Sequence, residues 1–442
     1  MKVSRLPVDT GISGWAALLP EPETAISLDA AIAADYLIIG AGFAGLSAAR
    51  RISQLDGQAR IVLLEAKRLA EGPAGRNSGF MIDLPHELSS TDYATTHEND
   101  LAQIRLNRQA IEFAADAAYE YKMPKEAFDK CGKINGAAAS AAIQHNLNYA
   151  KHLDALGEPF EMLNAEQMQK LTGSRFYQSG IKTPGTALIQ PAMYISALAK
   201  GLENRVSVFE NSPVICLTND QGSWIAETTS GLVQAPNVIL ATNGHVESFG
   251  FFKRQVFHVI LYASMSRQLS EMENNQTGEA NWGITPADPA ATTMRKISGS
   301  GGTRIITRNQ MTYSPSMSVS ESLVGKMATR HEKSFALRYP ELGNVEQEYS
   351  WAGRLCLSRN SAPAFGKIAD GLYSACCQNG LGTAKGTLSG MAIAELAVEG
   401  ETPLAKALIN QGSPQKLPPA PLDIVGAKAF MRWAEFKARS EL

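Results

Sequence analysis

The sequence is poor in cysteine and has no excess of charge of either sign. Its 442 residues include five cysteines, none of them in a CxxC arrangement, and its formal net charge is −2. A low, odd cysteine count argues against a disulfide framework and favours a reducing, cytoplasmic compartment. A nearly neutral chain without a basic stripe also makes nucleic acid an unexpected partner.

The sequence also lacks a long apolar run and a metal-binding pattern. Its N-terminus, MKVSRLPVDTGISGW, has no apolar core of signal-peptide length, and its most apolar stretch, residues 30–49, contains Asp35 and several glycines. We therefore expect no cleaved signal peptide and no membrane span. His145 and His152 share a predicted helix face, but no cysteine or acid completes a ligand set, so no metal site is expected.

The strongest pattern that is present is a glycine turn between two apolar runs. Residues 35–50 read DYLIIGAGFAGLSAAR, an apolar strand that turns at Gly40, Gly42 and Gly45 and continues as a helix. A second apolar run ends at Glu65, 20 positions after Gly45. This order of strand, turn, helix, strand and acid is typical of a dinucleotide-binding fold.

Each part of this pattern has a physical role. Gly40 allows the tight turn, Gly42 lets a pyrophosphate approach the backbone, and Gly45 lets the helix pack closely on the strand. The helix N-terminus offers N–H groups and a partial positive charge to the phosphates. Glu65 is expected to accept hydrogen bonds from ribose hydroxyls. The alternative is a purely structural glycine turn.

The rest of the chain predicts two domains, because it is too long for one simple core. Residues 1–34 are expected to form an arm on the surface, and residues 98–155 are alanine-rich and helical. Short strands follow from Val206, and helices are expected at 320–339, 383–398 and 427–439.

Several later segments, taken together with the glycine turn, resemble the FAD-dependent D-amino-acid-oxidase-like superfamily. They are GPAGRNSG at 72–79, QP at 190–191, ATNG at 241–244, WAG at 351–353, APAFG at 362–366 and GLGT at 380–383. The likeness is greater to the branch of amine and amino-acid oxidoreductases that includes sarcosine, glycine and gamma-glutamylputrescine oxidases. Ala74 departs from the serine often found in that branch.

The resemblance implies an α/β fold, in which a Rossmann-like FAD-binding domain is interleaved with an antiparallel-sheet substrate domain of the α+β type. The FAD-binding domain is expected at 1–86, 187–247 and 350–442, and the substrate domain at 87–186 and 248–349. The residues expected to bind FAD are Gly40, Gly42, Phe43, Ala44, Gly45, Glu65, Ala66, Arg76, Asn77, Ser78, Thr242, Asn243, Gly244, Gly380, Leu381, Gly382 and Thr383.

For two groups of these residues, the sequence leaves the role open. The helix that follows Gly380 and Gly382 is expected to direct its positive end at the flavin ring, or the glycines form a hinge between packed elements. Arg76 and Asn77 are expected to hydrogen-bond the ribityl chain or the ring edge, or Arg76 forms a surface salt bridge.

The sequence does not identify the catalytic residues. Candidates for an aromatic wall are Trp351, Tyr262, Tyr313 and His258, with ordinary core packing as the alternative. Arg295 and Arg304 are candidate anchors for a carboxylate, with a solvated strand edge as the alternative. Cys356 is expected to be a buried thiol, so that the flavin is held without a covalent bond.

The resemblance implies an enzyme that oxidises a C–N bond of a small amine or amino acid. Hydride passes to flavin, the resulting imine is hydrolysed to an aldehyde or keto acid, and oxygen or an electron carrier reoxidises the cofactor. One alternative is a flavin monooxygenase, but the segment SACCQNGLG lacks the Gly-Asp pair that such chains usually carry. The other alternative is a non-enzymatic dinucleotide-binding module.

Overall fold

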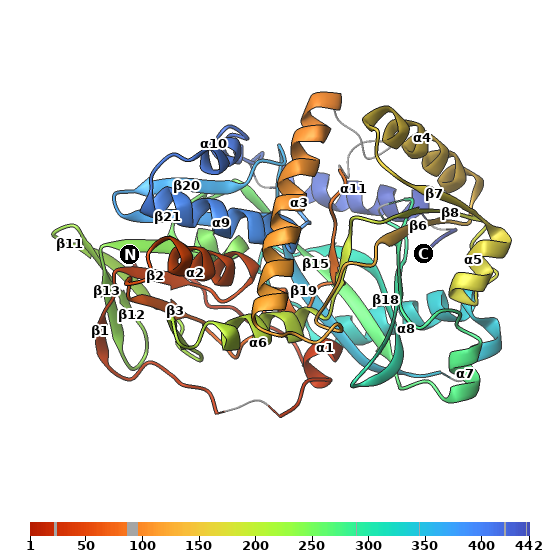
Figure 1. Ribbon diagram of the computed structural model, residues 1–442, viewed down its shortest axis with the longest axis horizontal. Coiled ribbons are helices and arrows are strands. Elements are labelled where there is room, and N and C mark those ends of the chain that lie inside the picture. Colours follow the sequence, from red (N-terminus) through yellow and green to blue (C-terminus); the bar gives the residue numbers. More distant parts are fainter. Residues whose placement is uncertain (22–23, 86–95, 289, 344, 420, 439) are drawn as a thin grey trace.

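The computed structural model describes residues 1–21, 24–85, 96–288, 290–343, 345–419, 421–438 and 440–442. Figure 1 shows two bodies side by side, with helix α3 (His97–Glu120) standing between them. One body is built on a parallel sheet and the other on a larger, mostly antiparallel sheet. The predicted α/β fold with an antiparallel second domain is therefore confirmed.

The parallel sheet has six strands. Their order is β10 (Val206–Phe209), β3 (Ile61–Leu64), β2 (Tyr36–Ile39), β14 (Asn237–Leu240), β21 (Leu372–Cys376) and β20 (Ala364–Ala369). The first five run parallel, and β20 runs antiparallel to β21. Every residue of β2 and β3 is buried, as expected of strands covered on both faces.

Alternate residues of these strands enter two different cores. Ile38 and Leu63 pack with helices, whereas Leu37 and Val62 pack with a four-stranded sheet on the opposite face. The helices on the first face are α2 (Phe43–Leu55), α6 (Pro191–Gly201) and α9 (Ala384–Val398). The four-stranded sheet has the order β1 (Ala31–Ala33), β13 (Leu232–Ala235), β12 (Ser223–Glu227) and β11 (Cys216–Asp220).

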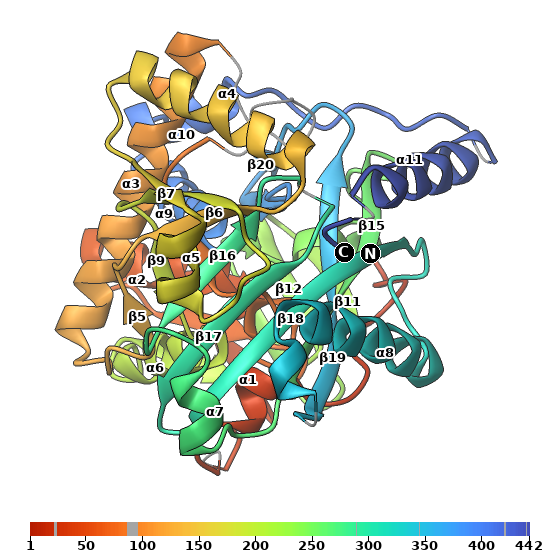
Figure 2. The ribbon, with the colours of Figure 1, turned by 90° about the vertical axis from the view of Figure 1, so that its right-hand side faces the viewer.

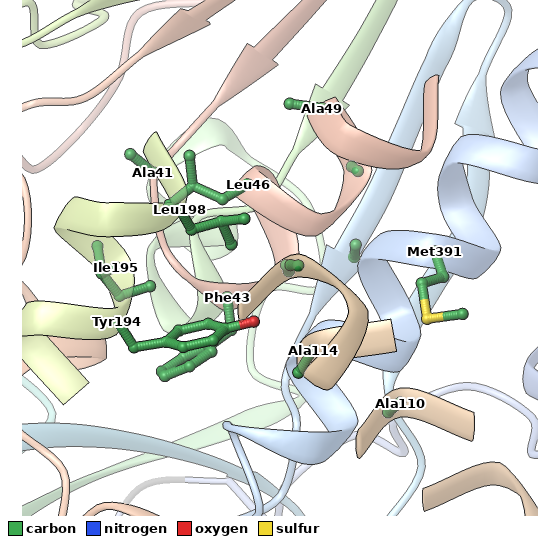
Figure 3. Close-up of a cluster of buried hydrophobic side chains, with 14 of the residues drawn as sticks. Ala41, Phe43, Leu46, Ala49, Ala110, Ala114, Tyr194, Ile195, Leu198 and Met391 are labelled. Carbon is green, nitrogen blue, oxygen red and sulfur yellow. The ribbon is translucent and has the colours of Figure 1, made fainter. Parts of the chain in front are cut away.

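The helical core is tight because small residues line it. In Figure 3, Phe43 and Leu46 of α2 face Tyr194 and Leu198 of α6. The rings of Phe43 and Tyr194 stack with centroids 5.8 Å apart. On the other side of α2, a Cβ atom at Gly390 of α9 would lie 2.3 Å from the carbonyl oxygen of Ala44. Only glycine at position 390 allows the two helices to approach this closely, and this contact holds the first turn of α2 against α9.

The larger sheet has eight strands. Their order is β19 (Gln347–Ser358), β15 (Val256–Ser266), β18 (Gly302–Tyr313), β17 (Thr293–Gly299), β16 (Trp282–Pro286), β6 (Lys133–Ala137), β8 (Ser179–Thr183) and β7 (Glu161–Asn164). All neighbours are antiparallel except β16 and β6. Helix α8 (Glu321–Arg338) packs on β15, β18 and β19, while α4 (Ser140–Leu156) and α5 (Ala165–Thr172) pack on the β6–β8 end.

The remaining elements are short or lie at the edges. They are α1 (Gly14–Ala17), β4 (Phe80–Met81), β5 (Phe128–Asp129), β9 (Ala187–Ile189), α7 (Glu271–Asn275), α10 (Pro403–Ile409), α11 (Leu422–Ala438) and the 3-10 helices η1 (Pro73–Gly75), η2 (Asn243–Phe249) and η3 (Pro340–Leu342). Of the helices within the described ranges, none is both long enough and apolar enough to cross a bilayer.

Much of the N-terminal segment is exposed, as expected of a surface arm, but parts of it are built into the protein. Trp15 in α1 is fully buried and packs edge to face with Trp351, with ring centroids 6.5 Å apart. Its indole Nε1 donates a hydrogen bond to the carbonyl oxygen of Asn77 at 2.8 Å. Further along, Ala31–Ala33 joins a sheet as β1. These partners are far away in sequence, so no local pattern indicates them.

At the C-terminal end, the strand pairing favours domain limits other than the expected ones. Strand β19 begins at Gln347 and pairs with β15 along its length, so residues 350–358 belong to the large sheet. The last helix, α11, contacts β18 of that sheet, and the Glu441 carboxylate accepts hydrogen bonds from the backbone of Ala138 and Ala139. The boundary expected between 86 and 87 lies outside the described residues. The other boundaries remain a proposal.

Candidate functional site

A cavity of about 300 Å³ lies where the carboxyl ends of β2, β3 and β14 meet the large sheet. Strand β2 has β3 on one side and β14 on the other, so the chain leaves β2 at the point where the strand order reverses. Ligands of open parallel sheets bind at this point. The cavity is lined by all the residues expected to bind FAD except Gly45 and Leu381.

The three glycines of the turn have separate geometric roles. Gly40 has φ +106°, a conformation that favours glycine, and a Cβ atom there would lie 2.8 Å from the Ala241 carbonyl oxygen. A Cβ at Gly45 would lie only 1.8 Å from the Gly40 carbonyl oxygen, so this glycine sets the helix–strand distance. A Cβ at Gly42 would meet only the Cβ of Ala74, at an ordinary 3.6 Å. The protein itself therefore does not require glycine at position 42, although that residue lines the cavity.

Two helices begin at the cavity wall without a side-chain cap from any described residue. Helix α2 starts after Gly42, and α9 starts after Thr383. The Thr383 hydroxyl donates instead to the Phe80 carbonyl oxygen at 2.7 Å. The N–H groups of a first helical turn have no partner within the helix, so the start of α2 suits an anionic ligand. At the start of α9, the N–H groups of Lys385 and Gly386 already donate to the carbonyl oxygens of Leu381 and Gly382, so that end offers mainly the positive end of the helix dipole.

Glu65 lies at the end of β3, beside the glycine turn. Its carboxylate accepts hydrogen bonds from the backbone N–H of Ala41 at 2.9 Å and of Lys67 at 3.2 Å. Burial raises the pKa of Glu65, and these backbone bonds oppose the rise. Each carboxylate oxygen can accept more than one hydrogen bond, which leaves capacity for ribose hydroxyls.

The N-terminal segment closes one side of the cavity, a feature that the sequence did not predict. Arg5, Leu6, Pro7 and Asp9 contribute to the lining. The buried carboxylate of Asp9 pairs with Arg354 at 2.9 Å. The two residues are remote in sequence, and neither stands in a recognisable motif.

The loop at 72–80 is held mainly by its own side chains. The guanidinium of Arg76 donates to the carbonyl oxygens of Glu71, Thr10, Gly11 and Ala352. Desolvation lowers the pKa of this guanidinium. Arg76 therefore does not form a surface salt bridge; it ties the N-terminal segment to β19. It also lines the cavity, and its contact with FAD remains a proposal.

The side chains of Asn77 and Leu381 also contact other parts of the protein. The Asn77 amide donates to the Ala74 carbonyl oxygen at 2.6 Å, and its side-chain oxygen accepts from the Gly79 N–H at 2.8 Å. The Leu381 side chain packs against the cluster of Phe80, Ile82 and Leu188. In the same turn, Gly380 has φ +92° and, like Gly382, lines the cavity.

The structure separates the catalytic candidates. Tyr262 and His258 on β15 line the cavity. The Tyr262 hydroxyl hydrogen-bonds the hydroxyl of Thr312 at 2.6 Å, and Nε2 of His258 contacts the Glu247 carboxylate at 2.5 Å.

The other candidates, Trp351, Tyr313, Arg295 and Arg304, do not line the cavity. The indole of Trp351 donates to the Arg76 carbonyl oxygen at 2.9 Å, and Tyr313 packs edge to face with Phe257. Arg295 donates to the carbonyl oxygens of Gly79 and Ile189 and lies over the Trp15 ring. Arg304 forms an ion pair with Glu348.

The sequence did not indicate several residues at the end of the cavity that lies against the large sheet. They include Arg308 on β18 and Met317 in the loop that follows it. Arg308 stands four positions after Arg304, on the same face of the strand, opposite Ala263 of β15. The alternation of a strand would have given both arginines the same orientation, and only the register shows which one meets the cavity.

These observations define a class of protein: a dinucleotide-binding protein in which the cofactor cradle, the turn at Gly40, Gly42 and Gly45, opens onto a second sheet. The cradle fits FAD, because Gly42 leaves the space that a Cβ would fill and an uncapped helix end adjoins it. The chain belongs to the FAD dependent oxidoreductase (DAO) family, which matches residues 35–396. It is therefore an FAD-dependent oxidoreductase.

Individual relatives are distant in sequence. The chain is 24% identical over 375 residues to a "Probable oxidoreductase OrdL" of Haemophilus influenzae, covering 82% of each chain. The glycine oxidase structure from Geobacillus kaustophilus superposes with a TM-score of 0.69 at 17% identity, over 88% of this chain and 100% of that one. The L-alpha-glycerophosphate oxidase of Mycoplasma pneumoniae with FAD bound gives a TM-score of 0.62 at 16% identity, over 88% and 97%.

Proposed function

We propose that this protein oxidises the C–N bond of a small amine or amino acid that carries a carboxylate. The observation that carries the proposal is the placement of Arg308 and Tyr262, on adjacent strands of the large sheet, in the cavity that also contains the glycine cradle. A planar guanidinium binds a carboxylate through two parallel hydrogen bonds and so fixes its orientation.

FAD, when bound, supplies the acceptor for the hydride removed from the substrate carbon, and water then hydrolyses the imine to an aldehyde or keto acid. The amides at the start of α2 would hold the pyrophosphate, and Glu65 would accept hydrogen bonds from the ribose. Arg308 would hold the substrate carboxylate. Leu261 and Met317 form an apolar wall of the cavity. Because an apolar environment disfavours the charged form of an amine, this wall would favour the neutral substrate nitrogen that the oxidation needs.

A second candidate is oxidation of a C–O bond in a hydroxy acid or related alcohol. The fold neighbour that is a glycerophosphate oxidase supports this alternative. The same cation, Arg308, would anchor the anionic group of either substrate, so it does not distinguish them. The monooxygenase alternative has no such support, and its Gly-Asp pair is absent from residues 372–383.

The test is anaerobic mixing of the yellow protein with matched pairs of compounds. Each pair has the same carbon skeleton and differs in bearing an amino or a hydroxyl group; a third member has the carboxylate replaced by an amide. Loss of flavin absorbance with the amino acid alone supports the proposal, and loss with the hydroxy acid alone overturns it. Admission of air then shows whether oxygen or a carrier reoxidises the cofactor.

The role of Arg308 needs its own variant. Arg308→Gln removes a charge-assisted interaction of about 1.5–3 kcal/mol, so half-reduction of the flavin should need about 10- to 150-fold more of the carboxylate substrate. The requirement for the amide analogue should change much less. Arg330→Gln is the matched control, because Arg330 is an exposed arginine that bonds Gln310 and does not line the cavity.

A further inference from the structure

Helix α11 presents a continuous apolar face to solvent. Its five large exposed apolar residues recur at helical spacing and share one side of the helix. They are Leu422 (64% exposed), Val425 (61%), Phe430 (59%), Trp433 (59%) and Phe436 (64%). Single exposed apolar residues are ordinary on a protein surface, but a contiguous patch marks an interaction site.

The opposite side of the helix packs against the protein, which fixes the direction of the apolar face. Ala438 is buried in a small cluster with Ala290 and Ala291, and Ala434 packs on the same cluster. The helix also contacts β18. Figure 2 shows α11 at the periphery of the molecule, beside β15 and β18. The face is therefore held outward by contacts on its other side.

Helix α11 carries three cations and two carboxylates, which differ in exposure. All three cations, Lys428, Arg432 and Lys437, are exposed, whereas its two carboxylates, Asp423 and Glu435, are only partly exposed. At about 100° per residue, Lys428 and Arg432 follow one edge of the apolar face. Lys437 lies on the aromatic side, 5.8 Å from the ring centroid of Trp433. Lys437 also forms an ion pair with Asp288 at 3.9 Å, so the positive charge beside the apolar face comes mainly from Lys428 and Arg432.

We propose that α11 binds the surface of a bilayer that contains anionic lipids. A helix with Trp, Phe and Leu on one face and cations beside it lies in the plane of the interface. Its apolar face enters the headgroup–acyl boundary, and its cations meet the headgroups. A second copy of the chain fits this face less well. Packing two identical faces would bring Lys428 and Arg432 of one copy close to those of the other, whereas both carboxylates of the helix are only partly exposed.

Trp433 provides a specific optical probe of this interaction. The other four tryptophans, Trp15, Trp224, Trp282 and Trp351, are at most 7% exposed. When the FAD-loaded protein is mixed with vesicles of phosphatidylcholine and phosphatidylglycerol, Trp433 emission should shift to shorter wavelength and the protein should float with the vesicles. Vesicles of phosphatidylcholine alone should bind it more weakly. Trp433→Phe should still float but lose most of the shift.

Variants separate the charge contribution from the apolar one. Lys428→Gln with Arg432→Gln should lower partitioning onto the anionic vesicles by about 25-fold, about fivefold for each cation. Phe430→Ser with Phe436→Ser should abolish flotation. Leu337→Ser is the matched control, because Leu337 is a 53% exposed apolar residue on α8, and it should behave as wild type.

Three results would overturn the proposal. The first is no flotation with anionic vesicles at low salt. The second is equal binding to both kinds of vesicle, since the cations would then have no part. The third is a dimer in light scattering that Phe430→Ser with Phe436→Ser converts to a monomer, which would assign the face to a second copy. Unchanged FAD content and thermal stability of each variant establish that it is folded.

Discussion

A matched pair of alanine substitutions in the glycine turn separates cofactor binding from folding. Gly42 and Gly45 are three positions apart, at the start of the same helix, and each is replaced by the same single methyl group. Their surroundings differ: a Cβ at Gly42 has its nearest protein atom at 3.6 Å, whereas a Cβ at Gly45 lies 1.8 Å from a backbone oxygen of Gly40. We expect the two variants to fail in different ways.

Gly42→Ala should weaken FAD binding and leave the apoprotein intact. Its φ of −86° is accessible to alanine, and the less flexible residue reduces the entropy of the unfolded chain, so the apoprotein should be unchanged or up to about 1 kcal/mol more stable. The methyl group occupies the approach to the backbone. Losing one charge-assisted hydrogen bond to a phosphate costs about 1.5–3 kcal/mol, which raises the Kd for FAD about 10- to 150-fold. Gly42→Val, with a larger branched side chain, should abolish FAD retention.

Gly45→Ala should destabilise the apoprotein, because α2 must move away from the turn. Overpacking of this kind costs about 1–3 kcal/mol or more, and at about 2 °C per kcal/mol the apparent Tm falls by several degrees. The assays are Tm of each apoprotein and titration of each with FAD. Full FAD affinity in Gly42→Ala, or an unchanged apoprotein Tm in Gly45→Ala, would refute this assignment of the glycines.

Three further predictions concern other parts of the molecule. Wild type and Cys356→Ser should both release free FAD on acid precipitation; a chromophore that stays in the wild-type pellet would show a covalent bond. Asp9→Asn should speed FAD dissociation, measured by the recovery of flavin fluorescence on dilution, because breaking the buried pair with Arg354 costs about 3–5 kcal/mol and loosens the segment at the cavity; an unchanged rate would contradict that role. Burial lowers the pKa of Lys133 from 10.5 to about 8, so between these values the unfolded chain binds more protons and stability rises with pH. Burial also lowers the pKa of Lys296 to about 8, so the apoprotein Tm of Lys133→Met should show a smaller rise than wild type, and an undiminished rise would assign it to other groups.

The parts of the site that follow from local sequence could be predicted, because their physics is local. The turn at Gly40 depends on its own backbone conformation, and Glu65 follows a buried strand at the spacing of a β-α-β unit. The helix after Gly382 also begins where the apolar pattern places it. These features need no knowledge of how distant segments meet.

The substrate end could not be predicted in the same way, because it depends on how distant strands align. Arg304 and Arg308 occupy equivalent faces of one strand, and they differ only in their neighbours. Glu348 of β19 pairs with Arg304, whereas Arg308 lies over the cavity. Tyr262 lines the same cavity, and beside it the pairing of β15 with β18 shifts by one residue at Gln310, which the sequence does not reveal.

The contacts of the N-terminal segment have a consequence for how the protein is made. Thr10 and Gly11 receive hydrogen bonds from Arg76, and Asp9 receives its ion pair from Arg354. During translation, residues 9–15 leave the ribosome first, yet Arg354 and the Trp351 ring that packs on Trp15 emerge only after most of the chain has been synthesised. The earliest segment of the chain is thus among the last to settle. Until it does, the wall of the cofactor cavity that Arg5, Leu6, Pro7 and Asp9 form is missing.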